Sequence, residues 1–462
     1  MPLVIVPTQR AHMRRVVITG LGTISPHGIG TPAFWNALLE AKSSTAALTL
    51  FDPSAFDSRV AGQVPAFKTT DYVPKSYRKA TKIMARDIEL AVIAADLAVR
   101  DAKLLTKAVA STVTNLDELK QTGWHAPNPA RVGCNIGAGL ICADLNELAA
   151  ALVQAKNPDN TFSLAKWGKS DDPGKTSGME SLTPLWLLKY LPNMLACHVS
   201  ILHDTQGPSN TITCGQASAG LALAEAARTI QRGNADLALV GGCESKLNPM
   251  ALMRWCKLNR LSTHCNDIPA TACKPYDVHA DGTVLAEGGA VLVIEEYEHA
   301  KARNATIYAE VVGIGSSANA AQSVIDPDPA GEAPAVAIQK ALKDANLTPN
   351  DIHLIVPPGY GIATWDKSDA AALHAVFNTN IPPIAPVRAG IGDCGAGAQA
   401  LDLAAAALAL QSQTLPPTAN TTQPLADLPI TTHKTSTSLM HALILATALG
   451  GQNSAIVLKR VH

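Results

Sequence analysis

The sequence contains no apolar run of the roughly 18 residues that a membrane-spanning helix requires. Its longest apolar stretches, residues 403–410 and 442–451, are too short to cross a bilayer. Residues 1–12 also lack a clear cleavage site and an apolar segment long enough for a secretory signal peptide. These absences predict a cytoplasmic protein whose folded part begins near Met13 or Arg14.

Neither sign of charge is in excess, because 37 basic residues are balanced by 38 acidic ones for a formal net charge of −1. A general nucleic-acid binder needs a surplus of Lys and Arg to neutralise phosphates, so this class is not favoured. The nine cysteines include no C-x-x-C pair, the spacing typical of zinc ligands. We therefore expect no metal and no cofactor, and we interpret the cysteines as small buried residues in a reducing compartment.

Aromatic residues are scarce at 4%, whereas 47% of the chain is hydrophobic and rich in Ala, Leu and Val. Aliphatic packing of this kind suits a buried parallel or mixed sheet covered by helices. Short β-branched runs such as Arg15–Gly20 predict strands, and apolar residues at helical spacing predict helices at 88–102 and 401–410. Strands alternate with helices along the chain, which indicates an α/β fold.

Two polar segments interrupt this alternation. Residues 104–130 have an irregular periodicity, and residues 156–181 are rich in Lys, Asp, Gly and Ser. Both are interpreted as surface insertions, which are either partner-specific surfaces or tolerated loops.

Several phrases of the sequence occur in a characteristic order. RRVVITGLGTISPHG begins at Arg14, GPSNTITCGQ at Gly207, DGTVLAEGG at Asp281 and GYGIATWDKSDAAAL at Gly359, and the glycine pair Gly450–Gly451 follows near the end. Together they resemble the β-ketoacyl-acyl-carrier-protein synthases (condensing enzymes) of type II fatty-acid and polyketide pathways. The resemblance extends from residue 13 to residue 461 apart from the two insertions.

The resemblance implies a thiolase-like fold, in which two similar halves form five layers in the order αβαβα and the protein works as a dimer. The halves would be residues 13–266, which contain the insertions 104–130 and 156–181, and residues 267–462. Active members hold a nucleophilic cysteine at a strand-to-helix turn, where the helix N-terminus favours the thiolate. Two histidines polarise the thioester carbonyl and assist malonyl decarboxylation, and a lysine orders the second histidine.

Gln216 occupies the position of the family's cysteine. That cysteine lies eight residues after the proline of a Gly-Pro pair, and counting from Pro208 gives Gln216. Counting back from the Gly241–Gly242 pair gives the same residue. Cys214 lies on the incoming strand before the turn, so we do not expect it to replace the nucleophile. The glutamine amide is instead expected to fill the site and bond the backbone N–H groups of the former oxyanion hole.

The other reactive positions are changed as well. Pro358 stands at the first histidine position, because it precedes Gly359, and Asp366 follows that glycine seven residues later. Proline has no titratable group for this role. Arg388 takes the lysine position and Asp393 takes that of the second histidine, where a carboxylate would repel a malonyl carboxylate. We therefore expect no catalytic residues here, and no activity of the chain alone.

This pattern is similar to the chain-length-factor subunits (ketosynthase beta) of type II polyketide and aryl-polyene systems. The resemblance implies a heterodimer with an active β-ketoacyl synthase subunit, which would supply the cysteine and both histidines and receive the acyl chain from acyl carrier protein. This chain would shape the acyl tunnel in fatty-acid, polyketide or polyene biosynthesis. We expect Leu140, Ile141 and Met194 to face that tunnel, and Leu449 to replace the phenylalanine of a family gate.

Two other functions stay open. Some condensing-enzyme domains with Gln for Cys decarboxylate malonyl groups on the carrier protein, but they keep the histidines that Pro358 and Asp393 replace. The second alternative is a non-catalytic homodimer that binds acyl chains or carrier protein, because one sequence does not specify an interface. Neither the pathway nor the chain length of its product follows from the sequence.

Overall fold

The computed structural model describes residues 13–170, 174, 176–319 and 325–461, and its main sheet has the order β10-β13-β14-β9-β1-β8-β7-β5-β6. The first-half strands are β1 (Val16–Ser25), β5 (Val132–Ala138), β6 (Ser209–Ile212), β7 (Leu237–Ser245) and β8 (Glu287–Glu296). The second-half strands are β9 (Ala309–Ala318), β10 (Leu354–Val356), β13 (His441–Thr447) and β14 (Gln452–Lys459). The halves meet where β1 pairs with β9 in antiparallel fashion.

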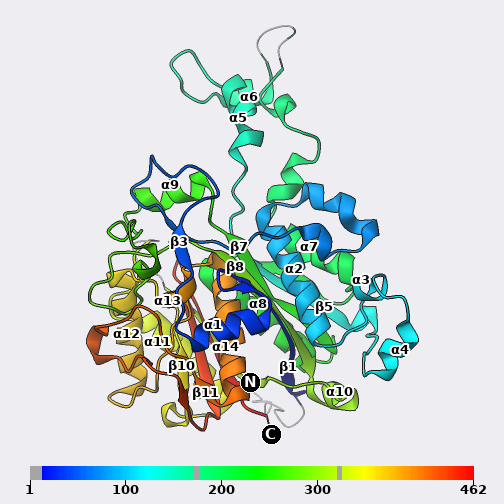
Figure 1. Cartoon of the computed structure of the whole chain (residues 1–462), viewed down its shortest axis with the longest axis vertical. Helices are drawn as coiled ribbons and strands as arrows, with labels where there is room; N and C mark the ends of the chain where they lie inside the picture. Colours follow the sequence, from blue (N-terminus) through cyan, green and yellow to red (C-terminus); the bar gives the residue numbers. More distant parts are fainter. Residues whose placement is uncertain (1–12, 171–173, 175, 320–324, 462) are drawn as a thin grey trace, which may run out of the picture.

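Helices form three layers around the strands of the two halves (Figure 1). α8 (Ser218–Gln231) and α14 (Ala398–Ser412) lie in the middle, between the strands of the two halves. The outer layers are α2 (Arg86–Asp101) with α7 (Met194–His203), and α11 (Glu332–Ala345) with α12 (Ala363–Phe377). The alanine-rich α14 is buried from Ala398 to Leu410, because its small apolar side chains can pack on all sides. The predicted five-layer order is confirmed.

The two halves repeat one close contact between a strand and a helix. A Cβ atom on Gly22 of β1 would lie 2.0 Å from the carbonyl oxygen of Ala94 in α2. A Cβ atom on Gly315 of β9 would lie equally close, 2.0 Å, to the carbonyl oxygen of Ala337 in α11. Glycine at both positions therefore lets a helix pack directly onto its strand. The strand orders β1-β8-β7-β5 and β9-β14-β13-β10 show the same equivalence.

The predicted elements are present with shifted ends. The strand predicted from residue 15 extends to Ser25, and the helices predicted at 88–102 and 401–410 are α2 and α14. β13 and α9 (Pro249–Lys257) are not evident from the sequence pattern, because β13 is apolar without alternation and α9 is short. The predicted division at residues 266 and 267 falls between β7 and β8, although β8 pairs with β1 and β7 and lies among the first-half strands. The bounds of the two halves stay a prediction.

The first predicted insertion, 104–130, contains α3 (Lys107–Ala110) and α4 (Leu116–Gln121) and packs beside α2 and α7. The second, 156–181, lies partly outside the described residues and belongs to a longer projection that begins at residue 144. We define the arm as the described residues from 144 to 192, with α5 (Leu145–Gln154) and α6 (Leu164–Gly168); Figure 1 shows it extending beyond the layered body.

The remaining elements connect or border these layers, and no helix in the described part of the chain is long and apolar enough to cross a membrane. They are α1 (Thr31–Leu39), α10 (Tyr297–Ala302), α13 (Arg388–Ile391), β2 (Gly28–Ile29), β3 (Thr45–Ala47), β4 (Val60–Gly62), β11 (Thr414–Leu415) and β12 (Thr435–Ser436).

The close packing of β9 on α11 predicts that Gly315→Ala destabilises the protein. The new methyl group would overlap the Ala337 carbonyl, and overpacking of a core typically costs about 1–3 kcal/mol. Chemical denaturation should show this loss in the free energy of unfolding. Gly168→Ala is the control, because no described atom lies within 4 Å of its Cβ position; equal effects of both substitutions would contradict the packing argument.

Candidate functional site

Gln216 lies in a tight turn between β6 and α8. Gly215 adopts a φ of +54°, which favours glycine, and the short 3-10 helix Gly215–Ala217 leads into α8. The Ser218 hydroxyl donates to the carbonyl of Gly215 (2.6 Å) and accepts from the N–H of Cys214 (2.8 Å). These two bonds fix the turn and direct the side chain of Gln216 into the interior, where it is 2% exposed.

The amide of Gln216 bonds directly to Asp393. Its Nε2 donates to Oδ2 of Asp393 at 3.0 Å, and Oδ1 of the same carboxylate accepts the N–H of Gly395 at 3.1 Å. Among the described residues, Oε1 of Gln216 has no hydrogen-bond partner. The predicted bonds from backbone N–H groups to this amide are therefore wrong, because the amide is oriented by the facing carboxylate. The structure does bring Gln216 and Asp393 together, although 177 residues separate them.

Arg388 is the cation of this cluster. Its Nε lies 3.5 Å from Oδ1 of Asp393, and its Nη2 lies 3.9 Å from Oδ2 of Asp402. The guanidinium also lies over the ring of Tyr360, 4.8 Å from its centroid. Burial raises the pKa of Asp402 to about 7, although the charge of Arg388 acts in the opposite direction. Arg388 and Asp393 are 1% and 0% exposed, so no solvent screens these charges.

Pro358 is buried in the loop that follows β10, two residues before Tyr360. Asp366 organises this loop by accepting the N–H groups of Tyr276, Tyr360 and Gly361 at 2.8–3.0 Å. The Tyr360 hydroxyl donates to the carbonyl of Thr447. The loop thus presents an aromatic ring, and no imidazole, to Arg388. We refer to Gln216, Pro358, Tyr360, Arg388 and Asp393 as the Gln216 cluster.

A buried ion pair that is not evident from sequence spacing lies beside the Gln216 cluster. Nζ of Lys246 is 2.7 Å from Oε1 of Glu244, and Oε2 of Glu244 accepts the N–H of Ala396 at 2.6 Å. The Lys246 ammonium also lies 6.0 Å from the centroid of the Trp255 ring. Lys246 could have been noticed as a lone cation directly after the buried strand β7, but a single residue of this kind carries little signal.

Cys214 does not have the environment of a reactive thiol. It precedes the turn, is half-buried, and burial raises the pKa of its thiol above the ordinary value. A raised pKa lowers the fraction of thiolate, the nucleophilic form. The position and the pKa of Cys214 therefore agree with its interpretation as a structural residue.

The four tunnel or gate candidates lie in different surroundings. Leu140 is 65% exposed and Ile141 is buried in the first-half core, whereas Met194 is half-buried at the start of α7. Leu449 packs beside Tyr360 and Trp365, and the Ala448–Leu449 backbone lies against Gly215. Leu449 is thus next to the Gln216 turn, as a gate would be. The tunnel role of all four residues stays a prediction.

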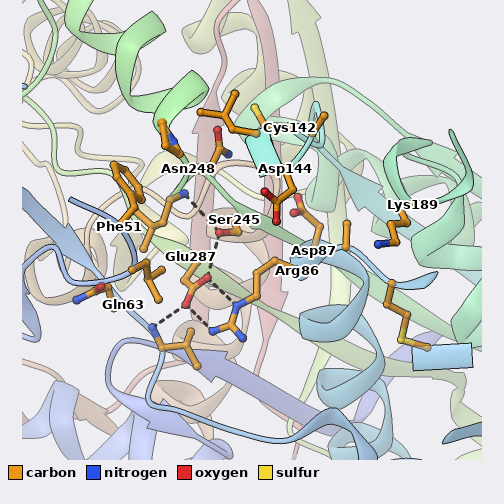
Figure 2. A pocket seen from close by; sticks show the side chains of 18 of the residues that line it. Phe51, Gln63, Arg86, Asp87, Cys142, Asp144, Lys189, Ser245, Asn248 and Glu287 are labelled. Carbon is orange, nitrogen blue, oxygen red and sulfur yellow. Dashed lines mark hydrogen bonds and ion pairs between the residues drawn. The ribbon is translucent and has the colours of Figure 1, made fainter. Parts of the chain in front are cut away.

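A cavity of about 970 Å³ opens at the root of the arm (Figure 2). Its wall includes Phe51, Asp87, Lys189 and Ser245. Arg86 donates two bonds to Glu287 at 2.7 and 2.9 Å, and the Ser245 hydroxyl donates to the same carboxylate at 3.0 Å. Ser245 and Glu244 are neighbours in β7, so their side chains point to opposite faces. Ser245 therefore faces the cavity while Glu244 faces the Asp393 loop.

Asp87 is a buried acid in the cavity wall, 3% exposed. Burial, assisted by the charge of Glu244, raises its pKa to about 8. The carboxyl is consequently protonated near neutral pH, and Oδ1 has no hydrogen-bond partner among the described residues. No group of three or more His, Cys, Asp or Glu residues in the described ranges is arranged to hold a metal ion.

The Gln216 cluster contains neither a thiol nor an imidazole. Its amide, carboxylate and guanidinium are directed toward one another and excluded from solvent. Such groups can stabilise the junction between the two halves of the chain. They offer no nucleophile for an acyl thioester, and the neutral amide donor of Gln216 already donates to Asp393.

Comparison with known proteins matches the N-terminal domain of β-ketoacyl synthases over residues 13–300 and their C-terminal domain over residues 308–422. The ketoacyl synthase beta subunit of the tetracenomycin polyketide synthase of Streptomyces glaucescens is 31% identical, over 96% of this chain and 98% of that protein. The 3-oxoacyl-[acyl-carrier-protein] synthase 2 of Coxiella burnetii is also 31% identical, over 97% and 99% respectively.

A solved type II polyketide synthase acyl-carrier protein in complex with its ketosynthase, AntDE:AntF, is similar in three dimensions. The matched chain is 28% identical with a TM-score of 0.78, covering 97% of this chain and 100% of that one. The predicted thiolase-like ketosynthase fold is therefore confirmed.

The Gln216–Asp393 bond predicts that Gln216→Leu lowers the free energy of unfolding by about 1–3 kcal/mol, because it removes a donor from a buried carboxylate. Thermal or chemical denaturation measures this loss. Gln206→Leu is the control, since among the described residues that exposed amide bonds only to the nearby Asp204, and its loss should change stability by less than about 0.5 kcal/mol. Equal losses of unfolding free energy in the two variants would show that the Gln216–Asp393 bond does not stabilise the fold.

The raised pKa of Asp87 predicts that the stability of the protein depends on pH. Its folded pKa of about 8 exceeds the ordinary value of 3.8, so between these limits the native state binds more protons than the unfolded state. Its contribution to stability therefore falls as pH rises from about 4 to 8, by at most about 1.4 kcal/mol per pH unit. Asp87→Asn should remove this fall, so the variant gains stability relative to wild type with rising pH.

Denaturation series from pH 5 to 9 test this expectation. Asp117→Asn is the matched control, because its side chain is 87% exposed and it should follow the wild-type profile. A stability difference between Asp87→Asn and wild type that stays constant with pH would show that Asp87 does not titrate in this window.

Proposed function

Because the chain belongs to the β-ketoacyl synthase family, we propose that it is a non-catalytic, chain-length-factor-like subunit of a type II fatty-acid, polyketide or polyene synthase. One observation carries the proposal: the Gln216 amide bonds to the Asp393 carboxylate where the family's cysteine and second histidine would face each other. The related tetracenomycin protein, a ketoacyl synthase beta subunit, supports this reading. We place the subunit in the cytoplasm.

The chemistry of condensation explains why this arrangement is inactive. Acyl transfer needs a thiolate, and an amide cannot form a covalent acyl intermediate. Decarboxylation of a malonyl group needs neutral or positive donors where negative charge develops. Asp393 places a carboxylate there and Pro358 supplies no donor, so both half-reactions lose their required groups.

The active partner would supply the cysteine and both histidines, and this chain would contribute the other wall of the acyl tunnel. The cavity of about 970 Å³ at the root of the arm is lined neither by the Gln216 cluster nor by the four tunnel or gate candidates. Leu449, next to the Gln216 turn, is the gate candidate closest to the former centre.

A basic surface supports contact with a carrier protein. The segment before α2 exposes Lys68, Lys75, Arg78, Lys79 and Lys82, with Asp71 as its exposed acid. Five cations on one short segment attract a partner with an acidic face and accelerate its association. We assign the carrier-protein contact to this segment.

The proposal predicts that the purified chain neither takes up an acyl group nor decarboxylates malonyl-acyl-carrier protein. Intact-mass measurement should show no covalent adduct, and chromatography should show no acetyl-carrier product. Co-expression with an intact ketosynthase of the same organism, one with the Cys-His-His set, should give a stable 1:1 complex that forms condensation products.

The intact ketosynthase alone is the positive control for acyl loading. Adduct formation on this chain that disappears in Cys214→Ala would overturn the non-catalytic assignment. Decarboxylation without an adduct would favour the decarboxylase alternative. If the chain remains a homodimer in the presence of the ketosynthase, the partner assignment is wrong. That result would favour the alternative of a non-catalytic homodimer that binds acyl chains or carrier protein.

A further inference from the structure

The arm extends from the body on two chain segments that meet at its root (Figure 1). There, Nζ of Lys189 is 2.5 Å from Oε1 of Glu147, and the Tyr190 hydroxyl donates to Oε2 at 2.7 Å. The same hydroxyl accepts the N–H of Asp144 at 3.2 Å. These bonds join the outgoing and returning segments, so the arm leaves the body in one defined direction.

The distal part of the arm also holds its own shape. The N–H of Ser163 donates to the carbonyl of Ala155 at 2.7 Å, and the N–H of Gly178 donates to that of Lys166 at 3.1 Å. The ring of Trp167 packs against Phe162 with centroids 5.9 Å apart. A surface held in this way loses little conformational entropy when it binds a partner.

The arm exposes an unusual amount of apolar side chain. Of the 18 exposed large hydrophobic residues in the described chain, eight lie in the arm, which makes up only about a tenth of the sequence. Six in the arm are 54–74% exposed: Val153, Phe162, Leu164, Met179, Leu185 and Leu187. Such a concentration on a protein surface marks an interaction site.

Charge identifies the kind of partner. The sequence from residue 144 to residue 192 carries five lysines and six acidic residues, for a net charge of −1. A segment without excess positive charge has no attraction for nucleic acid or for anionic lipid. Exposed Phe, Met and Leu side chains are typical of the centre of a protein–protein interface.

The neighbouring elements indicate a partner of the same fold. The arm returns to the body through α7, where Ile201 is 56% exposed, and α7 leads into β6. β6 is the last strand of the sheet, pairs only with β5 in the described part of the chain, and exposes Ser209 and Asn210. A second chain of this fold presents the same edge, and two such edges can pair around a two-fold axis.

We propose that the arm is the surface through which this chain contacts its active ketosynthase partner, with its apolar side chains lying on the body of that subunit. This inference rests on the proposed function and adds to it the element that makes the contact. The second predicted insertion is then a partner-binding surface and not a tolerated loop.

A triple substitution tests the proposal. Val153→Ser, Leu164→Ser and Leu185→Ser together remove three apolar groups that are 63–74% exposed, so the fold of this chain should be unchanged. Affinity for the intact ketosynthase, measured by titration or by analytical ultracentrifugation, should fall by at least about tenfold, because central apolar contacts dominate interface energetics. The matched control is Leu116→Ser, Met253→Ser and Val278→Ser, three residues 39–52% exposed outside the arm, which should bind like wild type.

The outcomes separate the two proposals. If the wild-type chain fails to bind the ketosynthase, the proposed function fails and the arm assignment fails with it. If wild type and the arm variant bind equally well, the arm assignment is wrong while the proposed function stands. Loss of self-association in the arm variant would identify a second copy of this chain as the occupant. Loss of binding to phosphatidylcholine–phosphatidylglycerol vesicles would identify a membrane, and either result overturns the inference.

Discussion

The bond between Gln216 and Asp393 connects the two halves of the chain at their equivalent turns. Gly215 and Gly395 have φ angles of +54° and +56°, each begins a 3-10 turn, and these turns lead into the central helices α8 and α14. The Gln216 amide spans from one turn to the carboxylate beside the other. Gln216 therefore lies on the junction that the layered fold is built around.

The charged groups at this junction are buried, so they need partners inside the protein. Removing a carboxylate and a guanidinium from water is costly, and the cost is offset only when each finds partners. Asp393 bonds to Gln216 and Gly395 and pairs with Arg388. Among the described residues the guanidinium nitrogens of Arg388 have no hydrogen-bond partner, so its charge is offset by the two carboxylates of Asp393 and Asp402 and by the ring of Tyr360. The changed residues consequently depend on one another, and restoring a single reactive group, such as Cys at position 216, would leave Asp393 without its amide donor.

The resemblance to condensing enzymes implied the layered fold and assigned Gln216 and Asp393 to facing positions, and the structure brings these two side chains together. The sequence did not reveal the direction of the Gln216 amide, since an amide can bond through either end and the choice depends on a residue 177 positions away. Lys246 was missed for a similar reason, because its partner Glu244 lies in a buried strand. The arm begins at residue 144, earlier than the polar composition indicated, because α5 is apolar enough to resemble a core helix.

The Gln216 cluster and the arm differ in their exposure to solvent. A working active site must stay open to its substrate, whereas here the polar groups of the centre are buried against one another, and Leu449 packs beside Tyr360 next to them. The arm has the opposite character, because its apolar side chains are left to solvent although the root and the distal contacts hold them in place. Exposed apolar surface favours aggregation of an isolated protein and is stabilising only when a partner covers it. A closed interior and an open, ordered exterior are what the proposed function requires, because such a subunit would act through contact with a second chain.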